Sequence, residues 1–332
     1  MIAAEVLKSF TGKNVLVTGG TGLIGRQVVS MLCDAGAHVK IVSLDAIAVH
    51  DKAAHLRKDL TSFEICKEVS KDMDFVFHLA GVQGTVQTSS AKMASHFVPT
   101  LMLNTNMLEA CRLNKVRKVV YTSSIGAYAD REILKESEES LTSSPMAFAG
   151  WAKRMAEQQI YAYRVQYGTE NFAIVRLSIV YGPGDNFDPE TALVIPALIC
   201  RIFRKDNPVT VWGDGSVVRD FVFSRDAAEG IILAIHYGTG GRFVNIGSGK
   251  GYSIREIVET LNSFITFNYE FDTTKPSGSH KRIMDITLAR NMILYNPTTS
   301  LVDGLQQTWK WFVSHPDEYL KKVNYFAIET ES

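Results

Sequence analysis

The chain has 332 residues, of which 46% are hydrophobic and 21% charged, and 35 Lys and Arg side chains balance 35 Asp and Glu side chains. This composition is typical of a globular protein with room for a large α/β domain and a smaller lobe. Zero net charge gives no overall attraction to nucleic acid or to an anionic membrane surface, so neither is an expected partner.

Membrane insertion and secretion are not expected either. No apolar run approaches the roughly 20 residues of a transmembrane helix. The first residues, Met1 to Lys8, are too short and too charged for a signal peptide. The four cysteines are scattered, without the spacing of a metal site. Because reduced, buried cysteines of this kind are usual in cytosolic proteins, we expect a cytoplasmic location.

Short β-branched runs alternate with segments of helical periodicity in the first half of the chain. We expect strands over 15–18, 39–42, 75–79, 119–123 and 172–177 and helices over 27–35, 61–70, 100–113 and 152–167. This alternation predicts an α/β fold with a doubly wound, Rossmann-like parallel sheet and helices on both of its faces.

Three glycines directly follow the first predicted strand, with the spacing G-x-x-G-x-x-G, and a helical pattern begins between them. A strand, a tight glycine turn and a helix place the pyrophosphate of a dinucleotide on a helix N-terminus. Glycine is needed because a Cβ would block close approach of the backbone to phosphate. A purely structural turn is the alternative. The predicted cofactor contacts of this turn are Gly19, Gly22, Leu23, Ile24 and Gly25.

The strand–helix alternation ends at the turn cluster 182–186, Gly-Pro-Gly-Asp-Asn. We therefore expect a dinucleotide-binding domain over residues 1–180 and a smaller mixed α/β substrate lobe over 181–328. Segments near 221–224 and 243–247 are expected to return to the sheet. The second lobe would cover the carboxyl ends of the strands, where such sheets bind their ligands.

Further short motifs follow in order: Asp59-Leu60-Thr61, His78-Leu79-Ala80-Gly81 and Tyr121-Thr122-Ser123-Ser124. With the glycine turn, they resemble the extended short-chain dehydrogenase/reductase superfamily, in its nucleotide-sugar epimerase/dehydratase branch, over roughly residues 13–315. The resemblance implies that Asp59 and Leu60 lie at the adenine and that Leu79 and Ala80 lie beside the cofactor. It also implies that Ser124 is the catalytic hydroxyl.

The end of the second predicted strand decides between NAD and NADP. A carboxylate there accepts a hydrogen bond from the ribose 2′-OH and repels a 2′-phosphate, whereas a basic residue does the opposite. Ser43 stands at the usual Asp position of the family, and Asp45 follows two residues later, with Arg26 and Lys40 near in sequence. Asp45 favours NAD over NADP, although a solvated loop aspartate is the alternative interpretation.

The resemblance also implies a Tyr-x-x-x-Lys pair on the helix after the serine strand. In the family the tyrosine moves the proton of the substrate hydroxyl, and the lysine lowers the pKa of the tyrosine and holds the nicotinamide ribose. Lys153 stands at the lysine position, but Ala149 holds the tyrosine position and cannot transfer a proton. Two interpretations stay open. Either the alanine was introduced by engineering, or the natural protein lacks the tyrosine and Lys153, Ser124 or a water carries the proton.

The absence of certain acid–base residues excludes some of the reactions that the family catalyses. Ile125-Gly126 stands where the 4,6-dehydratases of the family carry Asp-Glu. Ile125 and Leu193 stand where GDP-fucose synthases, which the second lobe resembles most, carry a Cys and a His for epimerisation. The remaining chemistry is NAD-dependent redox at C4 of a nucleoside-diphosphate sugar, as a dehydrogenase, ketoreductase or 4-epimerase. A catalytically silent dinucleotide-binding sensor is the competing hypothesis.

Substrate contacts follow from the same resemblance. A sugar diphosphate is held by arginine forks, and Arg219 and Arg282 stand at such positions. Val194 is expected to line the nucleobase pocket, and the loop resembling fucose synthases favours GDP over UDP. The helices over 100–113 and 152–167 resemble a dimer interface of the family, so we expect a homodimer. No metal site is expected.

Overall fold

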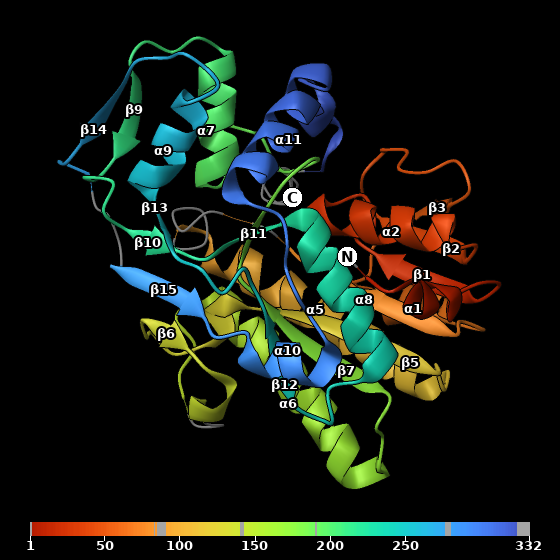
Figure 1. The fold of residues 1–332 in the computed structure, drawn as a ribbon. Coiled ribbons are helices and arrows are strands. Elements are labelled where there is room, and N and C mark those ends of the chain that lie inside the picture. Colours follow the sequence, from red (N-terminus) through yellow and green to blue (C-terminus); the bar gives the residue numbers. More distant parts are fainter. Residues whose placement is uncertain are drawn as a thin grey trace.

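Seven parallel strands form one sheet at the centre of the molecule (Figure 1). The computed structural model describes residues 2–82, 84, 91–139, 143–189, 191–275 and 280–323. The strand order is β12-β7-β5-β4-β1-β2-β3, and all neighbouring strands are parallel. The bounds are β1 (Asn14–Thr18), β2 (His38–Ser43), β3 (Ala54–Arg57), β4 (Phe75–His78), β5 (Lys118–Ser124), β7 (Phe172–Leu177) and β12 (Phe243–Ile246). The predicted Rossmann-like sheet is confirmed.

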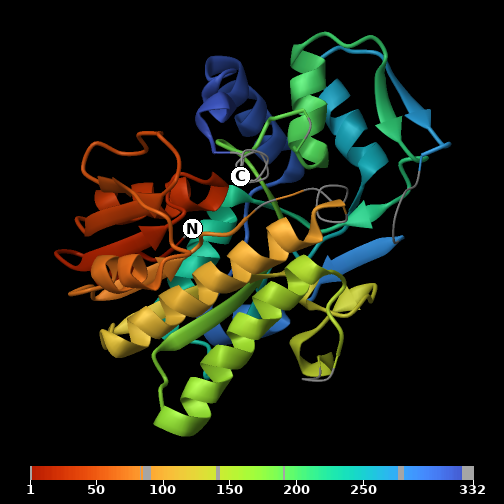
Figure 2. The same ribbon diagram turned by 180° about the vertical axis from the view of Figure 1, so that it is seen from behind.

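Helices cover both faces of this sheet. One face carries α2 (Leu23–Asp34) and α8 (Ser224–Tyr237), and the other carries α3 (Phe63–Val69), α5 (Met93–Leu113) and α6 (Phe148–Tyr167). Figure 2 shows α5 and α6 side by side on the second face. Strand β1 explains the arrangement, because Val15 and Val17 belong to one buried cluster and Leu16 to the other. A strand buried on both sides is continuously apolar, as this one is.

Some elements differ from the sequence-based expectation. Helix α5 begins at Met93 and contains Pro99, so it starts seven residues before the predicted start at residue 100. Strand β3 was not predicted, since its sequence, AHLR, has no apolar pattern and no position of it is fully buried. At the opposite edge of the sheet, β12 pairs with β7 as expected.

One expected strand placement was wrong. The segment near 221–224 does not join the central sheet, because β11 (Phe221–Phe223) pairs with β8 (Ile179–Tyr181) in a two-stranded sheet. All three β11 residues are buried, and two of them pack in the core of the second lobe. Apolarity showed that the segment is buried but not which strand it pairs with.

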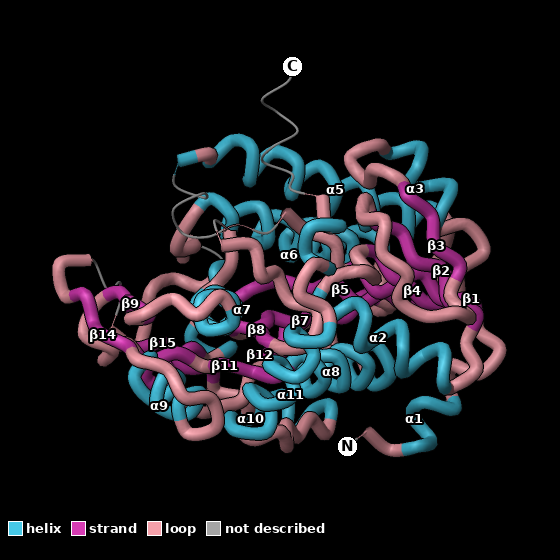
Figure 3. The backbone as a smooth tube through the Cα atoms, turned by 90° about the horizontal axis from the view of Figure 1, so that it is seen from above, coloured by secondary structure: helices cyan, strands magenta, loops and turns pink. Residues whose placement is uncertain are grey.

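The second lobe contains a mixed sheet with the order β13-β10-β15-β6 and a pair formed by β14 and β9. Figure 3 shows β9 and β14 at one end of the molecule and β1 to β3 at the other. The expected smaller mixed lobe is therefore present, while its exact boundaries at 180 and 328 stay a prediction, with residues 324–328 outside the described part. The remaining bounds are β6 (Ile133–Leu134), β9 (Val209–Trp212), β10 (Val218–Arg219), β13 (Tyr252–Ser253), β14 (Tyr269–Asp272), β15 (Lys281–Met284), α1 (Ala4–Lys8), α7 (Val194–Phe203), α9 (Ile254–Asn262), α10 (Thr287–Ile293), α11 (Leu301–Ser314), η1 (Ile125–Ala127), η2 (Glu136–Glu138) and η3 (Glu318–Lys321).

Three sequence-based expectations about the chain as a whole can be compared with the structure. Within the described residues, no helix is both long and apolar enough to cross a membrane. In the same part of the chain, no group of three or more His, Cys, Asp or Glu side chains is placed to hold a metal ion. All four cysteines are free and buried, as their scattered positions predicted.

Candidate active site

The order of the strands changes direction between β1 and β4. From this point the chain builds β2 and β3 on one side of the sheet and β5, β7 and β12 on the other. Ligands of doubly wound sheets bind outside the carboxyl ends of the strands at such a switch point. A cavity of about 610 Å³ lies there, lined by the glycine turn after β1 and by Leu79–Gly81 after β4.

The glycine turn has the geometry of a phosphate cradle. Gly19 has a φ of +67°, and a Cβ on it would lie 2.9 Å from the Cα of Ala80. A Cβ on Gly25 would overlap the carbonyl oxygen of Gly19, so this glycine lets α2 begin directly against the turn. The first turn of α2 contains no acidic residue. Its unpaired N–H groups and the helix dipole therefore suit the pyrophosphate of a dinucleotide.

The side of the cavity at the end of β2, where the adenosine of a dinucleotide is expected, carries a carboxylate in a fixed position; we call it the adenosine side. Asp45 lines the cavity, and its Oδ2 accepts a hydrogen bond from the hydroxyl of Thr21 at 2.6 Å. The hydroxyl of Ser43, at the usual family position, is instead paired with Nε2 of His55 at 2.9 Å. Because a carboxylate has about four acceptor positions, Asp45 retains capacity for a ribose hydroxyl. The residues of this region thus fit NAD.

A buried polar chain holds the strand ends beneath the cavity. The hydroxyl of Thr18 pairs with Nδ1 of His78 at 2.8 Å and accepts the backbone N–H groups of Leu79 and Ala80, each at 3.1 Å. Nε2 of His78 pairs with Oδ1 of Asn104 at 3.0 Å. Burial, together with the charge of Lys153, lowers the pKa of His78 to about 3, so the ring is neutral at physiological pH. These hydrogen bonds fix β1, β4 and α5 relative to one another.

A catalytic corner forms where α6 meets the end of β5. The hydroxyl of Ser124 accepts the N–H of Gly126 at 3.1 Å, so this serine caps η1 as well as lining the cavity. A Cβ on Gly150 would overlap the carbonyl oxygen of Gly126, and this close contact brings the first turn of α6 to Ser124. Ala149 and Lys153 line the same cavity.

Lys153 is the charged group of this corner. Its Nζ donates to the carbonyl oxygen of Thr122 at 2.9 Å, and burial lowers its pKa to about 8. The ammonium is therefore mostly charged at neutral pH and close to titrating. Ala149, one helical turn before it, presents a methyl group only, so position 149 supplies no phenol beside the hydroxyl of Ser124 and the ammonium of Lys153.

Every predicted cofactor and catalytic residue thus lines one cavity. The structure brings together Gly19, Gly22, Leu23, Ile24, Gly25, Asp45, Asp59, Leu60, Leu79, Ala80, Ser124, Ala149 and Lys153. His96 on α5 lines it too and was not predicted. Burial, with a smaller contribution from the charge of Lys153, lowers the pKa of His96. A lone histidine in an apolar helical segment gives no sequence signal of this position.

Three of the four predicted substrate residues, Val194, Arg219 and Arg282, lie outside the lining of this cavity, whereas the fourth, Ser124, lines it. Arg219 and Arg282 are register partners on β10 and β15, and Nε of Arg282 contacts Oδ1 of Asp130 at 2.9 Å. Burial lowers the pKa of Arg219, and the neighbouring Arg282 lowers it further. Two adjacent guanidinium groups suit an anion. Val194 begins α7, whereas Leu193, the residue before it, lines the cavity.

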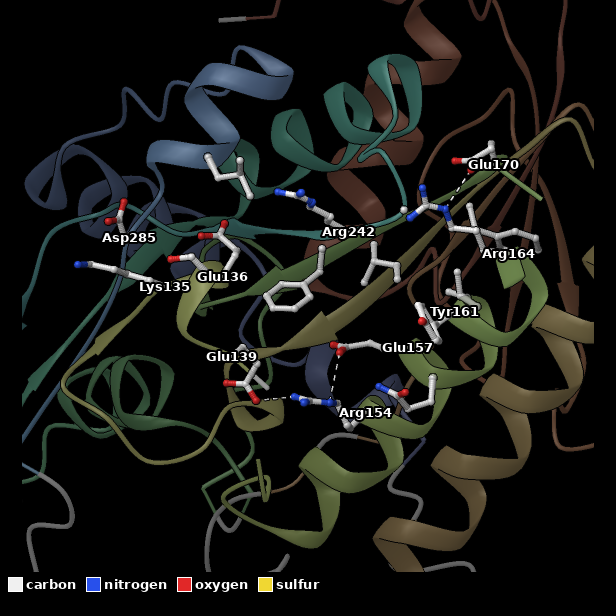
Figure 4. A pocket seen from close by; sticks show the side chains of 18 of the residues that line it. Lys135, Glu136, Glu139, Arg154, Glu157, Tyr161, Arg164, Glu170, Arg242 and Asp285 are labelled. Carbon is white, nitrogen blue, oxygen red and sulfur yellow. Dashed lines mark hydrogen bonds and ion pairs between the residues drawn. The ribbon is translucent and has the colours of Figure 1, made fainter. Parts of the chain in front are cut away.

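A second cavity of about 610 Å³ lies between α6, η2 and β12, away from the glycine turn. Figure 4 shows Arg154 between two carboxylates on its wall, Glu139 and Glu157. Arg176, fully buried beneath this wall, donates twice to Glu157, at 2.9 and 2.7 Å. None of the predicted site residues lies here, and the paired charges join α6 to β7 and to the segment after η2.

The parallel sheet, the glycine turn and the switch-point cavity define a protein of the Rossmann dinucleotide-binding class. The model of the NAD dependent epimerase/dehydratase family matches residues 15–247, and the chain belongs to this family. The family predicted from the short motifs is thereby confirmed.

Relatives with two kinds of nucleotide-sugar activity are similar to this chain over nearly its whole length. A probable GDP-L-fucose synthase 1 of Oryza sativa subsp. japonica is 29% identical, over 92% of this chain and 93% of its own. A putative UDP-glucose 4-epimerase of Methanocaldococcus jannaschii is 28% identical, over 90% of this chain and 97% of its own. The structure of a UDP-glucose 4-epimerase of Thermotoga maritima, solved with UDP-glucose, superposes with a TM-score of 0.81. The two chains are 27% identical, and the match covers 91% of this chain and 99% of the other.

Proposed function

We propose that this chain is an NAD-dependent oxidoreductase or epimerase that acts at C4 of a nucleoside-diphosphate sugar. One observation carries the proposal: a single cavity joins the glycine turn, Asp45, Ser124 and Lys153 from separate elements of the fold. The family supports NAD-dependent chemistry, and the names of the relatives support a nucleotide sugar as the substrate. Asp45 at the adenosine side favours NAD over NADP.

Some residues of the site would bind the cofactor, and others would contact the reacting group of the sugar. When bound, NAD supplies the acceptor or donor of a hydride. The N-terminus of α2 would hold the pyrophosphate, and Asp45 would accept the ribose hydroxyl. Lys153 would contact the nicotinamide ribose, and the hydroxyl of Ser124 would hydrogen-bond the oxygen on the reacting sugar carbon. Ala149 contributes space but no proton.

The apolar residues around the cavity favour redox at one carbon. Ile125 and Leu193 line it at the positions where related epimerising enzymes carry a Cys and a His. Neither side chain can take or give a proton, so removal of a proton beside a C4 ketone would lack its catalytic groups. We therefore propose oxidation or reduction at C4 without 3,5-epimerisation.

The diphosphate would lie at Arg219 and Arg282, whose strands are adjacent in the second lobe. A GDP-sugar is the proposed substrate, supported by the similarity of the second lobe to GDP-fucose synthases. The likeness to a UDP-glucose 4-epimerase structure favours a second candidate, in which the nicotinamide is recycled and the net product is an epimer.

Calorimetry tests the proposal directly. We expect NAD⁺ to bind the protein and GDP-L-fucose to bind the NAD⁺ complex more tightly than UDP-glucose does. A net change of absorbance at 340 nm on turnover indicates a dehydrogenase or ketoreductase, and turnover without such a change indicates a 4-epimerase. NAD⁺ binding with no binding of either sugar nucleotide would contradict the proposal and indicate a dinucleotide sensor.

A homodimer through α5 and α6 is the proposed assembly. Exposed apolar side chains recur at helical spacing on both helices: Val98 and Met102 on α5, and Phe148, Trp151 and Met155 on α6. Exposed apolar side chains gathered on two adjacent helices are typical of an interface, and a second copy would bury them symmetrically.

Met155→Glu is expected to convert the dimer to a monomer, because each interface would gain two charges related by the symmetry axis. Sedimentation velocity gives the mass of each species. Val313→Glu, on an exposed position of α11, is the matched control and is expected to leave the mass unchanged. A wild-type protein that sediments as a monomer at micromolar concentration would contradict the assembly.

A further inference from the structure

A short segment after α11 forms one wall of the cavity. We call residues 318–323 the C-terminal strap; it contains η3 and ends at Val323. Tyr319, Lys322 and Val323 line the cavity together with the glycine turn. No motif of the sequence pointed to this segment, which lies nearly 300 residues from the turn that it contacts.

Two contacts fix the strap against the glycine turn. Nη2 of Arg26, in the first turn of α2, donates to Oε1 of Glu318 at 2.6 Å and to the carbonyl oxygen of Thr21 at 3.2 Å. The backbone N–H of Val323 donates to Oδ1 of Asp45 at 2.8 Å. The strap is therefore held both at the start of α2 and at the carboxylate of the adenosine side.

Lys322 lies between these two contacts. Its Nζ donates to the carbonyl oxygens of Gly184 at 2.6 Å and Asp185 at 3.0 Å. Burial lowers the pKa of Lys322, while the nearby carboxylate of Asp185 acts in the opposite direction. An ammonium has three donors, so two carbonyl oxygens leave one N–H for a further acceptor.

The charges that line the cavity bear on the identity of that acceptor. The pyrophosphate of a dinucleotide carries two negative charges, and a helix N-terminus offsets only about half a charge. The cations among the described lining residues are Lys58, Lys153, His96 when protonated, and Lys322. Lys58 is exposed, and Lys153 and His96 belong to the catalytic corner. Lys322 is the half-buried cation on the side of the strap.

We propose that Lys322 is a ligand of the dinucleotide pyrophosphate and that the C-terminal strap is a third binding element of this site, beside the glycine turn and the end of β2. The assignment rests on the proposed dinucleotide site and adds to it a residue from the far end of the chain. A purely structural clasp, in which Lys322 only offsets the charge of Asp185, is the opposing account.

The test compares ligands with and without phosphate. Lys322→Met is expected to weaken binding of ADP and NAD⁺ by roughly 10- to 100-fold, the range for loss of one charge-assisted hydrogen bond. Binding of adenosine, which has no phosphate, is expected to stay unchanged. Lys321→Met, an exposed neighbour in the same turn, is the matched control and is expected to bind all three ligands as the wild type does.

A second variant separates charge from folding. Lys322→Gln keeps an N–H donor for the carbonyl oxygens of Gly184 and Asp185 but removes the charge, and it is expected to lose ADP affinity as the methionine variant does. Unchanged ADP affinity in a folded Lys322→Gln protein would overturn the assignment. An equal loss for adenosine and ADP would also overturn it, in favour of the clasp. A loss confined to NADP would overturn it by placing Lys322 at the 2′-phosphate. If the wild type binds neither ADP nor NAD⁺, the proposed function fails instead.

Discussion

Ala149→Tyr is expected to raise kcat by about 10²- to 10⁴-fold, the usual contribution of a positioned general acid–base group. Position 149 lines the cavity, one helical turn before Lys153 and in the same corner as Ser124. A phenol there would lie on the helical face of the ammonium, whose charge favours the tyrosinate and lowers the pKa of the phenol. The measurement is turnover of the sugar nucleotide that calorimetry identifies, under saturating NAD⁺.

Two further variants serve as controls for the expected gain in kcat. Ala149→Phe adds the ring without the hydroxyl, so it is expected to produce no gain. Lys153→Met in the Ala149→Tyr background is expected to remove most of the gain, because the phenol then loses its neighbouring charge. NAD⁺ affinity is expected to change little in Ala149→Tyr, since the glycine turn is untouched.

The result also separates the two interpretations of Ala149. A large gain indicates that this corner is built for a tyrosine and that the alanine removes it. No gain, in a variant that still binds NAD⁺ and the sugar nucleotide, would contradict the assignment of position 149. The parent protein would then use another proton carrier at the cavity, with Lys153 and His96 as its titratable neighbours.

Glu157→Gln is expected to lower the free energy of unfolding by about 3–5 kcal/mol, the cost of removing one partner of a buried ion pair, since Arg176 then keeps only the more distant Glu139, at 3.9 Å. Arg176 is fully buried between the rings of Tyr128 and Phe243, with its guanidinium carbon 4.2 and 3.8 Å from the ring centroids. Glu157 accepts two of its hydrogen bonds. Glutamine has the same size, so the effect is one of charge and hydrogen bonding. Urea unfolding followed by circular dichroism measures it.

Glu170→Gln is the matched control on the same side of the molecule. Its carboxylate pairs with Arg164 at 2.9 Å, but both side chains are well exposed. Because exposed pairs contribute about 0–1 kcal/mol, this variant is expected to unfold close to the wild type. Equal unfolding midpoints for the two variants would contradict the view that the cluster of Arg154, Arg176, Glu139 and Glu157 stabilises the packing of α6.

The cofactor half of the site was predictable because its signals are local. The turn from Gly19 to Gly25 follows its strand directly, and the geometry of each glycine depends on neighbours within a few residues or on one adjacent strand. Lys153 and Ala149 lie on one helical face by spacing alone. The core strands were predictable from short apolar runs, since the strands of a parallel sheet buried on both faces are continuously apolar.

The remaining features depend on contacts between distant segments. The apolar run 221–223 predicts burial, but its pairing with β8 is set by the packing of the second lobe. Strand β3 has few apolar residues because it lies at the edge of the sheet. His96 and Lys322 reach the cavity through the path of the backbone, and no pattern in their own neighbourhoods indicates it.

The strap has a consequence for how this protein is made. Synthesis proceeds from the amino terminus, and domains generally fold as they emerge. The glycine turn and Asp45 leave the ribosome early, whereas Glu318, Lys322 and Val323 are among the last described residues. A nascent chain therefore carries the glycine turn and Asp45 before the strap has been made. The proposed dinucleotide site is complete only once the strap has been made, so a polypeptide that stops after α11 keeps the cradle and lacks its closing wall.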